Sequence, residues 1–212
     1  MRRAALAAAI LSAALVGLGV YASRTGRLYR GDVREPGAWN GDVDRSRVVS
    51  EARKLIGVWY DPLQGYVGNL GGRAGLIVCT DVPVIAYRNA GASIKRLLES
   101  DYKAHPDRYG KRSGAPGDPF FHRRARNLYT WCKGNGRLDE LGPPRPGDVV
   151  FLSRAPLGTV SHIAVVSQVR ADGSYSVVEA SCDYFYATRE VEDFDLSRRG
   201  WFFRGFGRVL DR

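Results

Sequence analysis

The sequence contains few of the residues from which metal sites are built. Its 212 residues include three cysteines, three histidines and one methionine, and no pair of cysteines or histidines has the spacing of a zinc site. A glycine-rich phosphate loop, a nucleic-acid-binding motif and internal repeats are also missing. These absences argue against zinc-binding, nucleotide-binding and repeat proteins, and we expect neither a metal nor a cofactor.

Negative charge is scarce compared with positive charge. The chain has 32 Lys and Arg against 22 Asp and Glu, which gives a net charge of +10 and a pI near 9.8. This balance favours an anionic partner: nucleic acid, an anionic membrane surface or a cell-wall polymer rich in carboxylates and phosphates. Because no nucleic-acid-binding motif accompanies the charge, we do not expect a nucleic-acid partner.

The first 22 residues resemble a targeting segment. Two arginines precede an uncharged run from Ala4 to Ala22 that is rich in alanine and glycine. This layout is typical of a secretory signal cleaved after Ala22. The alternative is an uncleaved membrane anchor, since the run is nearly long enough to span a bilayer. Both interpretations predict export to the periplasm or the cell exterior, with membrane contact only through residues 1–22.

The remaining chain is predicted to form one domain. Residues 23–44 are rich in Arg, Gly and Asp without periodicity, which indicates a linker or an extended lead-in. Residues 45–212 contain enough apolar and aromatic side chains for one buried core. We therefore place the domain boundary near residue 45.

Helices are predicted in the first half of this domain and strands in the second. Apolar spacing indicates helices over residues 46–57, 80–91, 92–104 and 122–134, the first capped by Ser46 and ended by Gly57. β-rich runs separated by turns occupy residues 147–153, 160–169, 175–181 and 201–210. This order predicts an α+β fold in which the helices pack on one side of an antiparallel sheet.

Cys79 directly precedes the predicted helix in the stretch VCTDVPVIAYRNAG. A helix N-terminus has a partial positive charge and free N–H groups, which favour a reactive thiolate. A nucleophilic cysteine also needs a general base, and the chain offers His105, His122 and His162. The alternatives for Cys79 are a disulfide and a buried core position.

His162 is the best candidate for that base. It begins an apolar strand in which alternation places it on one face with Ala164 and Val166. Glu179 lies on the next predicted strand, where it can bond the second ring nitrogen and fix the tautomer of the imidazole. A structural role for the histidine is the alternative.

These stretches resemble a known group of enzymes. VCTDV, RPGDVVF, SHIAVVS and VVEAS are similar to the papain-like cell-wall hydrolases of the NlpC and CHAP type. Together with GVWYDP, ESDYKAH and HRRARNL, they more closely resemble the bacterial domain-of-unknown-function family DUF1287, which belongs to that superfamily. The resemblance implies a papain-like α+β fold with Cys79 as nucleophile, His162 as base and Glu179 at the third polar position.

Four further residues are candidates for binding substrate. Asp81 either caps the helix or contacts substrate, and Tyr60 either lines the cleft or packs within its loop. Arg123 and Arg124 either bind substrate carboxylates as bidentate partners or belong to a solvated basic face. His105 is expected at the surface.

Cys132 and Cys182 are the two cysteines left to pair with each other if Cys79 is the nucleophile. Export permits a disulfide between them, but the sequence does not show that their Cα atoms are close enough, so pairing and two free thiols both stay open.

The pattern as a whole favours an exported thiol hydrolase that cleaves an amide bond, with peptidoglycan or another anionic cell-envelope polymer as substrate. Two other hypotheses remain: a non-catalytic cell-wall or envelope-protein binding module on the same fold, and a Cys–His esterase or acyl hydrolase. An open basic groove beside Cys79 would favour an anionic amide as the substrate. A deep apolar tunnel there would favour an ester or a lipid acyl group.

Overall fold

The computed structural model describes residues 26–31, 35–36, 43–64, 74–181, 187–194 and 200–211. Within them the α-helices are α2 (Arg45–Arg53), α4 (Asp81–Ala90), α5 (Ile94–Ala104) and α6 (Ala125–Gly134), with short 3₁₀ helices η1 (Pro106–Arg108), η2 (Lys111–Ser113) and η3 (Phe121–Arg123). The strands are β1 (Leu138–Asp139), β2 (Val149–Ser153), β3 (Val160–Val169), β4 (Tyr175–Ala180), β5 (Thr188–Val191) and β6 (Phe202–Gly207).

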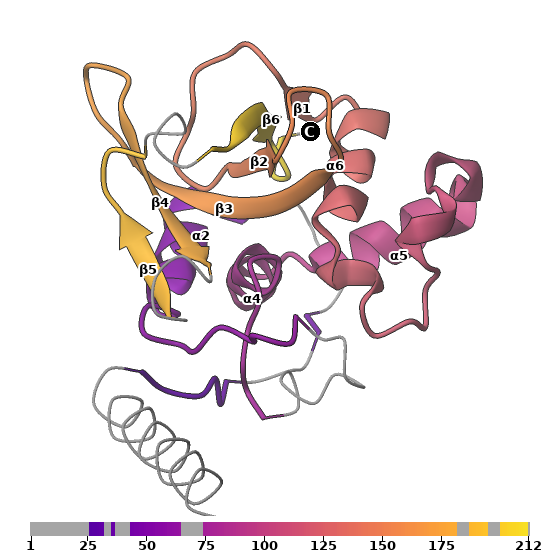
Figure 1. Cartoon of the computed structure of the whole chain (residues 1–212), viewed down its shortest axis with the longest axis horizontal. Helices are drawn as coiled ribbons and strands as arrows, with labels where there is room; N and C mark the ends of the chain where they lie inside the picture. Colours follow the sequence, from indigo (N-terminus) through magenta and orange to yellow (C-terminus); the bar gives the residue numbers. More distant parts are fainter. Residues whose placement is uncertain are drawn as a thin grey trace, which may run out of the picture.

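The strands form one sheet in the order β1-β6-β2-β3-β4-β5, and all neighbouring pairs are antiparallel. Figure 1 shows α2 and α4 beneath the curved β3, with α6 at one end of that strand and α5 beyond it. The predicted α+β class with an antiparallel sheet is confirmed.

Both faces of the sheet are buried. On the helix side, Val149, Ile163 and Val165 belong to one apolar cluster with residues of α2, α4, α5 and α6. On the opposite side, Ala164 and Val166 pack with Trp201 and Phe206 in a second cluster. Each fully buried aliphatic side chain contributes about 1.5–3 kcal/mol to folding. The central strand β3 is therefore held rigidly from both sides.

The first helix begins and ends earlier than predicted. Its N-cap is Asp44 rather than Ser46, because the Asp44 carboxylate accepts a hydrogen bond from the Ser46 amide. The helix ends at Arg53, and the chain turns before it reaches Gly57, whose φ of +83° suits glycine.

The prediction also missed β1 and β5, which are short strands at the two edges of the sheet.

Part of the segment expected as a linker lies against the domain. Arg27 forms a parallel β-bridge with Val58, and the Tyr29 amide donates to the Gly75 carbonyl oxygen at 2.8 Å. The predicted signal or anchor over residues 1–22 lies outside the described residues. Among the helices that the structure does describe, none has the length and apolar character needed to cross a membrane.

The RPGD turn joins three elements around the start of β2. Gly147 has a φ of +87°, and its carbonyl oxygen accepts a hydrogen bond from the Tyr87 hydroxyl of α4. Asp148 is fully buried and pairs with Arg45 of α2 at 2.6 Å. This turn fixes α4, the helix that follows Cys79, against the central strands.

Candidate active site

Cys79 lies in a tight turn immediately before α4. The Asp81 amide donates to the Val78 carbonyl oxygen at 2.9 Å, and the Val78 amide donates to the Asp81 carboxylate at 2.8 Å. These reciprocal bonds close the turn around Cys79. Cys79 is partly exposed and lines a cleft, so a substrate can reach it.

His162 faces this thiol from the beginning of β3. Its Nε2 lies 2.6 Å from Oε2 of Glu179, and its ring is also hydrogen-bonded to Cys79. Because Glu179 occupies Nε2, the remaining nitrogen Nδ1 is the one left for Cys79. The structure thus brings together the three residues predicted as nucleophile, base and orienting group.

The electrostatics of the three groups favour a protonated imidazole. Burial lowers the pKa of His162, but its hydrogen bonds to Cys79 and Glu179 outweigh that effect and raise the pKa to about 10. Glu179 is fully buried on β4, where a carboxylate needs such a partner. At neutral pH the histidine is therefore a proton donor.

Sequence reasoning missed two residues that surround this histidine. Trp201 stacks on the His162 ring with centroids 5.0 Å apart and planes at 21°. The guanidinium carbon of Arg154 lies over the indole ring of Trp201, 3.5 Å from the ring centroid. Trp201 stands before β6 and Arg154 after β2, so only the sheet order β6-β2-β3 brings them to His162.

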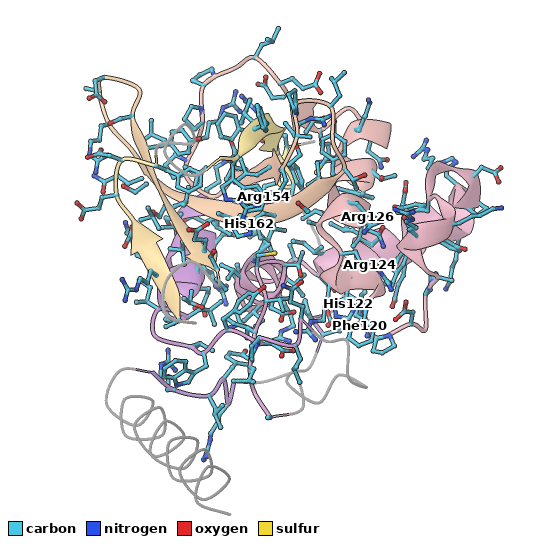
Figure 2. The ribbon with its side chains drawn as sticks, in the orientation of Figure 1. Phe120, His122, Arg124, Arg126, Arg154 and His162 are labelled. Carbon is cyan, nitrogen blue, oxygen red and sulfur yellow. The ribbon has the colours of Figure 1, made fainter. Side chains whose placement is uncertain are left out.

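A cleft of about 480 Å³ opens at Cys79 and His162. Tyr60, Trp201 and the arginines 123, 124, 126 and 154 are part of its wall, and none of its described lining residues is acidic. Figure 2 shows Arg124 and Arg126 on the α6 side and Arg154 and His162 on the sheet side. Tyr60 therefore lies in the cleft wall, although it is mostly buried.

The structure pairs Asp81 and Arg123 with each other. The two side chains form bonds of 2.9 and 2.7 Å, and only 12% and 6% of their surfaces are exposed. Thr80 and Asp81 were both candidates for the cap of α4. Thr80 is the N-cap residue, but its hydroxyl donates to the Arg123 carbonyl oxygen and caps no helical amide. This pair therefore anchors the turn of Cys79 to η3.

Arg124 is also engaged by the protein. It donates to the Asp118 carboxylate at 2.6 Å and to the Ser113 carbonyl oxygen at 3.1 Å. Arg126 lines the same cleft and has no such partner among the described residues. Among the described residues, Arg126 is therefore the unpaired arginine of this segment, and the two arginines predicted to bind substrate are both paired.

Neither His105 nor Cys132 lines this cleft. His105 is exposed after α5, as expected. Cys132 is a fully buried free thiol whose pKa is raised by burial, so the structure does not show the disulfide that the sequence left open. Cys182 lies outside the described residues.

A metal centre or a larger hollow could compete with this site. In the described ranges, no group of three or more His, Cys, Asp or Glu residues could hold a metal ion. A hollow of about 920 Å³ lies between residues 27–31 and α2, but its lining contains no cysteine or histidine.

The fold and the site define an α+β domain in which a cysteine at a helix start, a strand histidine and a strand glutamate are hydrogen-bonded in series. The chain belongs to the family described as Domain of unknown function (DUF1287), whose model matches residues 63–193, more than half of the chain. The match includes Cys79, His162 and Glu179. A comparison with curated proteins gave no match.

Proposed function

We propose that this protein is an exported thiol hydrolase with a papain-like fold of the NlpC and CHAP type, and that it cleaves amide bonds in peptidoglycan peptides. The observation that carries the proposal is the series Cys79–His162–Glu179, with its 2.6 Å bond between His162 and Glu179. A nucleophile, a base and an orienting group in hydrogen-bond contact are the machinery of acyl transfer.

In the proposed reaction the Cys79 thiolate attacks the amide carbonyl carbon. Backbone N–H groups at the start of α4 stabilise the oxyanion that forms. The His162 imidazolium then donates its proton to the leaving amine as the C–N bond breaks, which yields a thioester on Cys79. Neutral His162 next takes a proton from water, whose oxygen attacks the thioester, and the acid product leaves as the thiolate and the imidazolium are restored.

The charge of the cleft supports an anionic amide substrate over an acyl chain. Its wall contains four arginines and no acidic residue among those described, whereas a lipid acyl group would need an apolar tunnel. Peptidoglycan stem peptides carry free carboxylates, which match the guanidinium fork. The basic net charge of +10 would also concentrate such a polymer near the protein.

The test is to incubate the purified protein with peptidoglycan and to measure new free amino groups and released fragments by mass spectrometry. We expect cleavage by the wild type, and a loss of at least a thousandfold in Cys79→Ala and His162→Ala. Binding without cleavage by the wild type would reject the hydrolase and favour a binding module.

A further inference from the structure

A second hollow of about 270 Å³ adjoins the cleft at Cys79. It is lined by residues from η2, α6, β6 and the loop before β3, among them Arg112, Arg126, Tyr129, Thr159, Val160 and Arg204. Arg126 and Val160 line both hollows, so the two share a wall. Val160 stands two residues before His162 on β3, a distance of roughly 7 Å along a strand.

The described side chains that line this second hollow carry positive charge only. Its described lining includes three arginines and no acidic side chain. Arg204 is held in place, because it donates to the Gly158 carbonyl oxygen and lies 5.8 Å from the ring centroid of Tyr129.

Arg112 and Arg126 have no ion-pair or hydrogen-bond partner for their side chains among the described residues. Arg112 is exposed and Arg126 partly exposed. Neighbouring arginines differ, since Arg123 is paired with Asp81 and Arg124 with Asp118. The free cations near the site are thus concentrated in the second hollow.

We propose that the second hollow is an anion subsite, in which Arg112 and Arg126 bind a carboxylate or phosphate group of the substrate that occupies the Cys79 cleft. This inference rests on the proposed function, and it names the substrate as an extended polyanion. An arginine fork binds two oxygens of either group. Because Arg126 lines both hollows, an anion bound there can belong to the same substrate that reaches Cys79.

The test measures binding in the full chain with Cys79→Ala, which prevents turnover. The probes are a peptidoglycan stem tetrapeptide with free carboxylates, the same peptide with those carboxylates amidated, and an oligomer of glycerol phosphate. By calorimetry, we expect Arg112→Gln and Arg126→Gln each to weaken binding of an anionic probe about tenfold. The probe that responds, tetrapeptide or phosphate oligomer, identifies the source of the anion.

The matched control is Arg96→Gln, which removes an equal charge from an exposed position on α5. It should change binding less than twofold. The subsite is wrong if the binding of neither anionic probe depends on Arg112 or Arg126. It is also wrong if Arg96→Gln weakens binding equally, or if Arg112→Gln and Arg126→Gln weaken the binding of the amidated peptide as much as that of the free peptide.

A failure of the subsite proposal can be distinguished from a failure of the hydrolase proposal. Cleavage of peptidoglycan with unchanged KM in Arg112→Gln and Arg126→Gln would reject the subsite and keep the enzyme. An inert Cys79, together with anion binding that is lost in both variants, would keep the subsite and reject the enzyme.

Discussion

At the scale of single residues, Cys79 and Glu179 together favour the protonated form of His162. The Glu179 carboxylate is fully buried, away from solvent, and lies 2.6 Å from Nε2 of His162. It therefore favours the protonated imidazolium form of His162. Together with Cys79 it raises the pKa of His162 against the opposing effect of burial. Glu179 acts on the pKa of His162 first through its hydrogen bond and then through its charge.

Glu179→Gln tests this role, because the amide keeps the shape and an acceptor oxygen but removes the charge. We expect the pKa of His162 to fall from about 10, and kcat to decrease about ten- to a hundredfold with little change in KM. An NMR titration of the His162 ring in both proteins measures the first effect. An unchanged titration would show that Glu179 has only a structural role.

At the scale of elements, the start of α4 is fixed by the pair between Asp81 and Arg123. The Asp81 carboxylate bonds both the Val78 amide and the Arg123 guanidinium, and the Thr80 hydroxyl bonds the Arg123 backbone. The turn that presents Cys79 is thus attached to η3. The pair acts on Cys79 through this turn, so Asp81 and Arg123 are positioning residues.

We predict that Arg123→Met lowers the free energy of unfolding by about 2–4 kcal/mol, because it leaves the largely buried Asp81 carboxylate without its cation. It should also slow alkylation of Cys79 in protein that is still folded. Urea unfolding and alkylation rates provide the measurements.

Arg124→Met is the matched control for this prediction, since its pair with Asp118 is more exposed, at 28% for both side chains. We expect it to cost less than about 1 kcal/mol. Equal losses in the two variants, or normal alkylation of Cys79 in Arg123→Met, would reject the positioning role.

At the scale of the whole molecule, the raised pKa of His162 makes folding stability depend on pH. Its ordinary value is 6.5 and its folded value about 10. The imidazolium is favoured in the folded state, so its contribution is fully present below about pH 6.5 and is lost as the pH rises through 10.

We expect the difference in unfolding free energy between the wild type and His162→Gln to shrink by a few kcal/mol between pH 6.5 and 10, at about 1.4 kcal/mol per pH unit at most. Urea unfolding across this range measures the difference. His105→Gln, at an exposed position, should leave the curve unchanged. A pH-independent difference would contradict the raised pKa.

The sequence predicted this site where the signals are local. Cys79 stands before a helix with a clear apolar face, and the strands of His162 and Glu179 follow each other along the chain. The partners of Asp81 and His162 were not predictable in this way. Arg123 is 42 residues from Asp81, and Trp201 reaches His162 only because β6 inserts beside β2.

Whether Cys79 is an activated nucleophile can be tested by the rate at which iodoacetamide alkylates it as a function of pH. Site-specific mass spectrometry follows the reaction in the wild type and in His162→Ala. An ordinary thiol becomes reactive near about pH 8.5. The Cys79–His162 pair predicts fast alkylation well below that pH, and slower alkylation there in His162→Ala. An ordinary profile that His162→Ala leaves unchanged would contradict the assignment of Cys79 as an activated nucleophile.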